Sequence, residues 1–565
     1  MGLEKFAPIF EKLNLTQENS YLIKPFFTNL DDSVFAVTFL PPEVIGALCS
    51  RTSRAKEDLR LIFLNEFVKP FLEEESEYGK SLKALIDFLH KYPIELIFSN
   101  PKGREFYIKW LAQFGDDSIA QMAGSHLIYS ALSQVAIKHF EDMRLGIAPI
   151  EKSTRYVDYS SKVNPSPNVL GERVNNQYRY YTDPILEKIG LTGEYKSAMD
   201  NLFEIYSLLL EKYFNHLKKQ YPEEKDSLLK TKAFDVLRKL LPAATLSQIS
   251  FFGNGQAFEY LVNRSLNHKL GEIRWAGQRA FEELSKIIPA FLRRAESEDS
   301  KQYQRYLGER GERINRALEQ IDWKKEVIPS GTSVRLLEYD KDGENKIIAG
   351  LLYLELHEPY EHLLQKVRSL SVNEKEKILQ EVLKDRKYKY YKIPRAFENT
   401  YLRFEILMNI GAWRDLHRHR IHTQYRERFN VHNGFDMPEE LKEAGLDKEA
   451  ESAISKVTEL FKKIEKSDTD VAQYCCALGH RIRFIQYQNL RSFFWETELR
   501  TIPEGHPDYR KIEQEKIRLV QKIYPLISKY LLVDMKDYNF ARRGVAEKIQ
   551  KKEEDLKQYF QQKNN

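Results

Sequence analysis

Apolar residues recur three and four positions apart over most of this chain, which is the spacing of amphipathic helices. The clearest helical segments are 59–72, 195–241, 454–466 and 512–531. Strand-like apolar runs are fewer, and they fall at 34–40, 334–339 and 347–356. Lys341-Asp342-Gly343 between the last two runs is typical of a hairpin turn. The pattern predicts an α+β fold that is rich in helix.

Domain boundaries are suggested by a stretch of low apolar content at 290–330, which is dominated by Arg, Glu, Gln and Lys. Such a composition favours a solvated connecting helix. We therefore predict a first domain at 1–295, a charged helical connector at 296–330, a second domain at 331–550 and a charged tail at 551–565.

The two predicted domains share a spacing of particular residues. Arg264 and Pro289 are 25 positions apart, and so are Arg500 and Pro525. A further arginine lies ten positions into each interval, and an asparagine precedes each copy (Arg274 and Arg510, Asn254 and Asn489). Amphipathic helices alone often match by chance, but arginines and a terminating proline in one register do so rarely. We infer two tandem copies of one domain.

Composition indicates the cellular compartment and excludes some classes of protein. The 565 residues are 42% hydrophobic and 30% charged, and the net charge is +5, which argues against wholesale wrapping of nucleic acid. Three cysteines give no disulfide framework, and no apolar run approaches transmembrane length, so we expect a cytoplasmic protein without a membrane partner. No Walker loop or Gly-x-Gly-x-x-Gly fingerprint occurs, and no Cys-x-x-Cys pair indicates a metal site.

One stretch carries most of the candidate chemistry. Residues 413–429, WRDLHRHRIHTQYRERF, hold five arginines and three histidines. Arginine suits bidentate contacts to phosphate, whereas lysine would serve equally well for solubility. Only Glu427 is acidic beyond Asp415, so the segment cannot neutralise itself. We interpret it as an anion-binding site, with a solvated charged helix end as the alternative.

Several motifs resemble those of flavin-dependent (alternative) thymidylate synthases. Arg418-His419-Arg420 with Thr423 and Arg428-Phe429 is similar to the family signature of Arg-His-Arg, two residues, Ser, four residues, then Ser-x-Arg-Tyr. In the second half, Asn489-Leu490-Arg491-Ser492 with Arg500 resembles the second motif block. The first half offers three similar segments: Glu151-Lys152-Ser153-Thr154-Arg155-Tyr156, Arg238 to Pro242, and Asn254 with Arg264.

Each copy departs from the family pattern at different places. The first has Met143-Arg144-Leu145 where Arg-His-Arg is expected, and Gln256 where the second has Arg491. The second is two residues short between Thr423 and Arg428, and carries Asp415 in place of a family glutamine. Because the losses are nearly complementary, we expect one site composed from both repeats.

The resemblance implies reductive methylation of dUMP to dTMP, with FAD, NADPH and methylenetetrahydrofolate as cofactors and co-substrates. It implies nucleotide and folate as small-molecule partners, and a homodimer that mimics the family's tetramer. Arg500 would be catalytic, polarising the uracil ring. The residues implied to bind substrate are Glu151, Lys152, Ser153, Thr154, Arg155, Arg238, Arg264 and Arg418. Those implied to bind FAD are Arg418, His419, Arg420, Asn489 and Arg491.

Simpler interpretations stand beside these roles. The arginines of 413–429 could form a surface salt-bridge network, Ser153 could cap a turn, and Arg500 could pair with Glu496 or Glu504 at a helix end. At the level of the whole protein, the alternatives are a catalytically inactive flavin- or nucleotide-binding homologue and a nucleic-acid-binding protein that uses 413–429.

Overall fold

The computed structural model groups the chain into two compact units. It describes residues 2–73, 76–92, 101–102, 105, 109, 117–164, 176–321, 331–541 and 545–563. Unit 1 comprises Met1–Glu211, Leu240–Val327 and Gly445–Ala477. Unit 2 comprises Lys212–Lys239, Ile328–Ala444 and Leu478–Asn565.

The two units exchange a segment of chain. Residues 212–239 precede the predicted boundary near 295 but belong to unit 2, and residues 445–477 follow it but belong to unit 1. Each compact unit therefore draws on both predicted domains, and the predicted boundaries of the sequence repeats stay a prediction. Residues 322–330 of the predicted connector lie outside the described residues.

Each unit contains a four-stranded antiparallel sheet with the same strand order. In unit 1 the order is β1-β2-β4-β3, with β1 Val34–Ala36, β2 Gly124–Ser133, β4 Leu246–Asn254 and β3 Ile147–Glu151. In unit 2 it is β5-β6-β8-β7, with β5 Ser333–Tyr339, β6 Leu402–Asn409, β8 Arg481–Gln488 and β7 Thr423–Arg426. The predicted α+β fold with a sheet in each of two tandem copies is confirmed.

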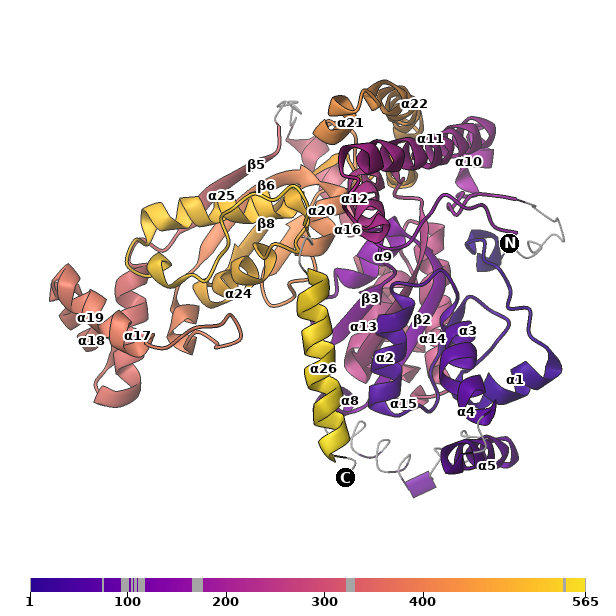
Figure 1. Ribbon diagram of the computed structural model, residues 1–565, viewed down its shortest axis with the longest axis horizontal. Helices are drawn as coiled ribbons and strands as arrows, with labels where there is room; N and C mark the ends of the chain where they lie inside the picture. Colours follow the sequence, from indigo (N-terminus) through magenta and orange to yellow (C-terminus); the bar gives the residue numbers. More distant parts are fainter. Residues whose placement is uncertain are drawn as a thin grey trace. The chain divides into compact units, whose positions relative to one another are not determined.

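The helices that follow the strands also repeat. After β2 and β6 come α9 (Gln134–Glu141) and α20 (Ile410–Leu416). After β4 come α13 (Gly255–Ser265) and α14 (Gly271–Ser285), and after β8 come α24 (Leu490–Arg500) and α25 (Pro507–Ile523), as Figure 1 shows. Asn254 and Asn489 cap α13 and α24, each accepting the backbone N–H three residues on at 2.8 Å.

The remaining elements cover these two cores. Those of unit 1 are η1 Leu3–Phe6, α1 Gln17–Ile23, η2 Lys24–Phe26, α2 Pro42–Thr52, α3 Leu59–Ile62, η3 Phe63–Val68, α4 Lys69–Glu73, α5 Glu77–Lys91, α8 Asp117–Met122, α10 Ile185–Lys188, α11 Thr192–Gln220 (divided at Glu211), α15 Pro289–Leu292, η5 Arg293–Glu296, α16 Glu298–Gln320, α22 Asp447–Glu465, α23 Thr469–Ala472 and η7 Gln473–Cys475. Those of unit 2 are α12 Asp226–Leu237, η4 Arg238–Leu240 (divided before its last residue), α17 Gly343–Leu356, α18 Tyr360–Ser369, α19 Val372–Val382, η6 Arg395–Asn399, α21 Glu439–Glu443, η8 Ser528–Tyr530 and α26 Val545–Lys563.

One predicted strand is wrong. The apolar run 347–356 lies in the helix α17, and 341–343 turns into that helix instead of closing a hairpin. A short apolar run with β-branched residues fits a strand and a buried helix equally well. Packing decides here, because Ile347, Ile348 and Ala349 are all buried and α17 lies against α18 and η6.

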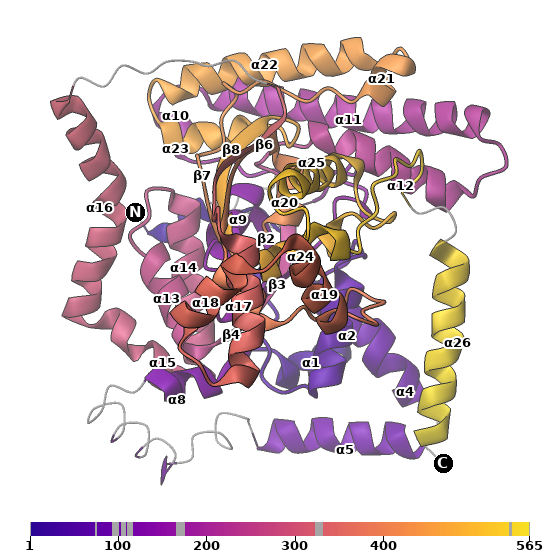
Figure 2. The same cartoon turned by 90° about the vertical axis from the view of Figure 1, so that its left-hand side faces the viewer.

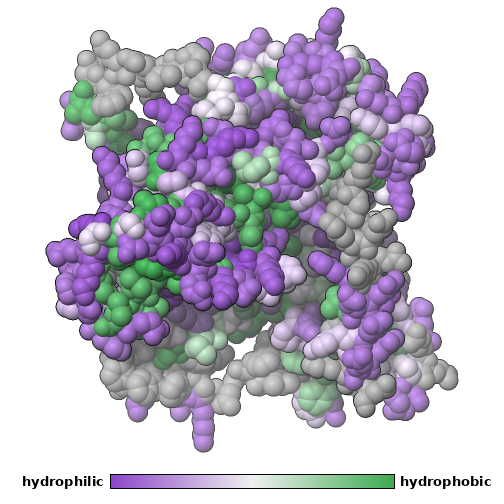
Figure 3. All heavy atoms as spheres, turned by 60° about the vertical axis from the view of Figure 1, so that its left-hand side comes forward, coloured by the Kyte–Doolittle hydropathy of each residue, from purple (hydrophilic) through white to green (hydrophobic). Residues whose placement is uncertain are grey.

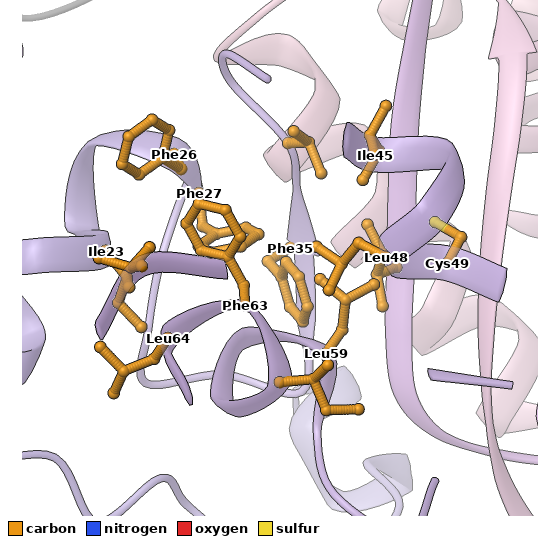
Figure 4. Close-up of a cluster of buried hydrophobic side chains, with 14 of the residues drawn as sticks. Ile23, Phe26, Phe27, Phe35, Ile45, Leu48, Cys49, Leu59, Phe63 and Leu64 are labelled. Atoms are coloured by element: carbon orange, nitrogen blue, oxygen red, sulfur yellow. The ribbon is translucent and has the colours of Figure 1, made fainter. Parts of the chain in front are cut away.

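The amino-terminal elements of unit 1 form a core of their own. Phe27 packs edge-on against Phe35 of β1 and Phe63 of η3, with ring centroids 5.5 and 5.6 Å apart. Figure 4 shows these rings among Ile23, Leu48 and the neighbouring apolar side chains. Ile128 of β2 belongs to the same cluster, so these segments cover part of the unit 1 sheet.

The segment 445–477 is anchored in unit 1 by polar contacts. Tyr474 donates its hydroxyl to Glu272 at 2.8 Å, and the same carboxylate accepts the backbone N–H and the hydroxyl of Ser133. Lys456 donates to Asn201, so α22 runs alongside α11, as Figure 2 shows. All of these groups lie within unit 1.

On the face drawn in Figure 3, hydrophilic side chains cover most of the described surface. Among the described residues, none of the helices is both long and apolar enough to cross a bilayer. The cysteines Cys49, Cys475 and Cys476 are free and buried.

Candidate functional site

The Arg-His-Arg segment lies in unit 2, directly after α20. Asn409 caps this helix by accepting the N–H of Ala412 at 2.8 Å, and the helix ends at Leu416. The chain then turns toward β7, which leaves Arg418 exposed and His419 and Arg420 half-buried. A helix end of this polarity favours cations, because its last carbonyls carry partial negative charge.

His419 is joined to Arg500, the last residue of α24. Arg500 donates Nε–H to His419 Nε2 at 2.7 Å, and its guanidinium carbon lies 5.6 Å from the centre of the Tyr509 ring. A histidine nitrogen can accept this bond only when it carries no proton. Burial, together with the nearby Arg500 cation, holds the pKa of His419 well below its usual value, so the ring stays neutral.

This contact orients the rest of the Arg500 side chain. Within the described part of the chain, neither Nη atom of Arg500 has a hydrogen-bond partner, so two N–H-bearing ends remain for a ligand. The predicted pairing with Glu496 or Glu504 is not found: Glu496 binds Lys516 at 2.8 Å instead. The geometry suits recognition of a carbonyl or oxyanion.

A residue from the first half of the sequence reaches the same unit. Arg238 begins η4, and its Nη1 lies 3.4 Å from Asp415 Oδ2, with both side chains largely buried. Asp415 stands on α20, three residues before Arg418. Unit 2 thus brings together Arg238 from one copy with Arg418, His419 and Arg500 from the other.

Glu427, the acidic residue near the end of the 413–429 segment, is hydrogen-bonded to β8. Glu427 accepts the backbone N–H of Arg483 at 2.7 Å and is hydrogen-bonded by Asn433. Arg426 packs over Trp413 and Phe429, with its guanidinium carbon 5.0 and 4.7 Å from the ring centres. Arg418, Arg420 and Arg428 complete the basic set on this loop. This donor set fits the phosphates of a nucleotide or dinucleotide.

Two of the predicted flavin-binding residues have local structural roles. Asn489 caps α24 by accepting the N–H of Ser492. Arg491 donates Nε–H to the carbonyl of Ile393 at 2.9 Å and pairs with Glu398 at 2.8 Å. Arg418 and Arg420 lie on the loop after α20, and their binding of FAD stays a prediction.

The predicted nucleotide loop of the first copy lies in unit 1 and is mostly structural. Glu151 forms a buried ion pair with Lys138 at 2.9 Å. Lys152 donates to the carbonyls of Lys56 and Glu57, and burial lowers its pKa to about 8. These contacts tie Glu151 and Lys152 to neighbouring parts of unit 1, and their binding of the nucleotide stays a prediction.

The remaining residues of that loop form a capped turn. Ser153 accepts the backbone N–H of Arg155 at 3.2 Å, and its carbonyl accepts from Val157, which is the alternative stated for Ser153. Thr154 and Arg155 are largely buried, at 3% and 8% exposure. Arg155 belongs to unit 1 and Arg418 to unit 2, so their predicted joint action stays a prediction.

Helix caps fix the register between the two copies. Counting from Asn254 and Asn489, the position of Arg500 in α24 is taken by Ser265 in α13. Arg264 lies one residue earlier, half-buried over Tyr260, and its predicted equivalence to Arg500 is wrong. The loop after α13 is one residue shorter than the loop after α24. An alignment that starts from Pro289 and Pro525 therefore pairs Arg500 with Arg264, one residue before its structural equivalent.

The same method corrects the first copy of the Arg-His-Arg segment. Ser133 caps α9 as Asn409 caps α20, each accepting the N–H three residues on. Counting from these caps, Asp142, Met143 and Arg144 stand at the positions of Arg418, His419 and Arg420. Unit 1 therefore has a methionine in place of the histidine that binds Arg500.

The sequence analysis did not predict a buried polar cluster that lies between α24 and α25. Lys516 of α25 lies between Glu496 of α24 and Glu513, and all three side chains are fully buried. The signal was present, because these residues interrupt apolar helix faces that carry Phe493, Ile512 and Val520. Among the described residues, no group of three or more His, Cys, Asp and Glu side chains could hold a metal ion.

Comparison with known proteins identifies the family. The model of the Thy1 family, thymidylate synthase complementing protein, matches residues 75–290 and 335–526. A UPF0159 protein of Chlamydia pneumoniae is 33% identical over 540 residues, covering 93% of this chain and 96% of its own length. A UPF0159 protein of Chlamydia muridarum is 32% identical over 540 residues, covering 94% and 97%.

Among solved structures, a UMP/dUMP methylase of Streptomyces cacaoi bound with 5-Br dUMP aligns with 36% of this chain and 95% of its own, at 13% identity and a TM-score of 0.29. The first matched region contains β2, β3 and β4 with α13 and α14, and the second contains β6, β7 and β8 with α24 and α25. The chain belongs to the flavin-dependent Thy1 family of thymidylate synthase complementing proteins and carries two divergent copies of its domain in tandem.

Proposed function

We propose that unit 2 catalyses the flavin-dependent reductive methylation of dUMP to dTMP. The observation that carries this proposal is the Arg500–His419 contact at 2.7 Å, with Arg238 of the other copy bound to Asp415 in the same unit. These residues match family motifs, and no single copy supplies all of them. FAD, reduced by NADPH, would supply the hydride, and methylenetetrahydrofolate the carbon.

In this proposal Arg500 binds the uracil ring. Its two Nη groups donate to a carbonyl of the base, where negative charge develops as the ring is reduced. His419 fixes the direction of these donors, because its neutral Nε2 accepts the Nε–H of Arg500. A preorganised cation of this kind costs no reorganisation during the reaction.

The remaining arginines would bind the phosphates of the nucleotide and of the flavin. Arg238 and Arg418 serve the nucleotide phosphate, and Arg420 serves the flavin phosphates, because bidentate guanidinium groups suit phosphate oxygens. Asp415 holds Arg238 in place and balances part of the charge when no phosphate is bound. We further propose that the protein acts as a homodimer in the cytoplasm.

The test is the release of tritium from 5-tritiated dUMP by the purified chain. We expect a yellow protein whose tritium release requires NADPH and methylenetetrahydrofolate together. The matched control is Arg518→Lys, which changes an exposed arginine of α25 that pairs with Glu515 and should leave the activity unchanged. A colourless preparation that binds neither FAD nor dUMP would refute the proposal.

A yellow protein without turnover would support the inactive homologue instead. Tritium release separates the enzyme from the inactive homologue, and titration calorimetry then tests whether an inactive protein still binds dUMP. Assembly is checked by light scattering, in which a monomer contradicts the proposed dimer.

A further inference from the structure

A buried ionic cluster fills the core of unit 2 between α24, α25 and β8. Lys516 Nζ lies 2.8 Å from Glu496 and 3.1 Å from Glu513, and it donates to Gln486 Oε1 at 3.4 Å. Gln486 in turn donates to Glu496 at 2.6 Å and to Gln488 at 2.9 Å. The ionic side chains have no exposed surface, and removing charges from water is costly.

Unit 1 has uncharged residues at the four positions equivalent to this cluster. Counting from the caps Asn254 and Asn489, Leu261 stands at the position of Glu496 and Phe251 at that of Gln486. Counting from the first turns of α14 and α25, the equivalents of Glu513 and Lys516 are Gly277 and Ala280. All four unit 1 residues are buried.

The comparison of the two units indicates that the ionic cluster is not required for folding. Apolar side chains at a buried ion-pair site are often as stable as the pair, or more stable. Unit 1 shows that this fold forms with apolar side chains at these positions. Folding alone therefore does not explain why unit 2 has a lysine, two glutamates and a glutamine there.

The cluster extends to the Arg500–His419 contact. Gln486 Nε2 lies 3.4 Å from the ring of His422, and Gln424 Nε2 lies 2.8 Å from the same ring. The rings of His422 and His419 are stacked, with centroids 5.9 Å apart and planes 22° apart. Hydrogen bonds and ring contacts thus connect Lys516 to the imidazole that accepts from Arg500.

We propose that Lys516, Glu496 and Glu513 are positioning residues that hold His419, and through it the Arg500 guanidinium, in the geometry for catalysis. This inference rests on the proposed function, and it goes further by naming residues that act on the site through His419. Unit 1 has Met143 for His419, Ser265 for Arg500 and apolar residues for the cluster. None of the three positioning residues needs to contact the substrate.

The charges of the cluster suit this role. Lys516 lowers the pKa of Glu496 against the effect of burial, whereas burial and the neighbouring Glu496 raise the pKa of Glu513 to about 8. At neutral pH the cluster therefore holds one carboxylate, one ammonium and one neutral carboxyl. Its net charge is zero, and its charges act on the pKa of His419 in opposite directions, because Glu496 raises this pKa and Lys516 lowers it.

The test replaces the ion pair with apolar residues, following the apolar core of unit 1. The double variant Glu496→Leu/Lys516→Met should fold, because the carboxylate and the ammonium are removed together and the remaining Glu513 is neutral. Its kcat for thymidylate formation should fall roughly 100-fold, since small misplacements of catalytic groups have effects of that size. Its KM for dUMP should change little, because the phosphate contacts remain.

A second readout does not depend on turnover. In protein labelled with ¹⁵N-histidine, the His419 Nε2 resonance should report an acceptor nitrogen in the wild type and should shift in the double variant. The resonance is assigned with His419→Gln. If the double variant fails to fold, Glu496→Gln, which keeps the size of the side chain, should produce the same shift.

The matched control is Glu376→Leu/Lys529→Met, which removes an exposed ion pair of unit 2 at 2.6 Å. It should change neither kcat nor the His419 resonance. A folded Glu496→Leu/Lys516→Met protein with wild-type kcat and an unshifted His419 resonance would overturn the inference. If the wild type makes no thymidylate, the proposed function fails, and the His419 resonance alone still decides whether the cluster positions it.

Discussion

The neutral carboxyl of Glu513 predicts an unusual pH dependence of stability. Its folded pKa is raised to about 8, mainly by burial and next by Glu496, from an ordinary value of 4.5. A raised carboxyl pKa means that the folded state holds this proton more tightly than the unfolded chain does. The stabilisation is complete below about pH 4.5 and is lost as the pH rises toward 8.

The size of the effect follows from the shift. Each pH unit inside this window removes at most about 1.4 kcal/mol, so the interval from pH 5.5 to 7 removes at most about 2 kcal/mol. For domains of 150–250 residues, 1 kcal/mol corresponds to roughly 2–4 °C in melting temperature. Wild-type protein should therefore lose up to roughly 4–8 °C over this interval through Glu513 alone.

The variant Glu513→Gln isolates this contribution, because its amide stays neutral at every pH. Melting temperatures of both proteins are measured by calorimetry from pH 5.5 to 7.5 at constant ionic strength. The wild-type curve should fall relative to that of the variant. Glu515→Gln, an exposed change two residues along the same helix, should follow the wild type. Parallel wild-type and Glu513→Gln curves would show that Glu513 is ionised, and the charge assignment of the cluster would be wrong.

Three further changes test single contacts. Arg500→Lys keeps the charge but loses the Nε–H that binds His419, and kcat should fall about 10²–10³-fold in the tritium-release assay. Asn489→Ala removes the cap of α24 and should cost about 1 kcal/mol in denaturant unfolding, while Asn489→Asp, which keeps the cap, should cost little. Tyr474→Phe removes a buried hydrogen bond to Glu272 and should lower the stability of unit 1 by about 1–3 kcal/mol, with unchanged kcat.

The tandem repeat could be read from the sequence because its markers are local. Asn254 and Asn489 begin helices through their own side chains, and each copy has a proline where its second long helix ends. The register of Arg264 could not be read in this way. Alignment from the prolines crosses the loop between the two helices of each copy, and these loops differ in length by one residue. An error of one residue corresponds to a rotation of about 100° around a helix.

The composition of the two units depends on contacts between distant residues. The segment 212–239 has the same helical pattern whichever unit it joins, so its sequence gives no sign of the exchange. The cluster at Lys516 was missed for a related reason. Charged residues on a helix usually mark its solvated face, and only the fold shows that this face of α25 is buried.

The exchanged segments determine which unit receives the guanidinium of Arg238. Arg238 begins η4 eight residues before β4, and Gln473 begins η7 eight residues before β8, so the two positions are equivalent. Arg238 lies in unit 2 and Gln473 in unit 1. At Arg500 and Lys516 too, unit 2 has a cation where unit 1 has an uncharged residue.

This difference between the units predicts the effect of exchanging Arg238 and Gln473. Arg238→Gln alone should weaken dUMP binding at least tenfold, because charged hydrogen-bonding partners contribute about 1.5–3 kcal/mol each. In Arg238→Gln/Gln473→Arg the total charge of the chain is restored, but the guanidinium moves to unit 1. Because unit 1 lacks a counterpart of His419 and Arg500, titration calorimetry with dUMP should show the same loss in both variants. Recovery of affinity and turnover in the double variant would place a competent site in unit 1, and the division of labour between the two copies would then be wrong.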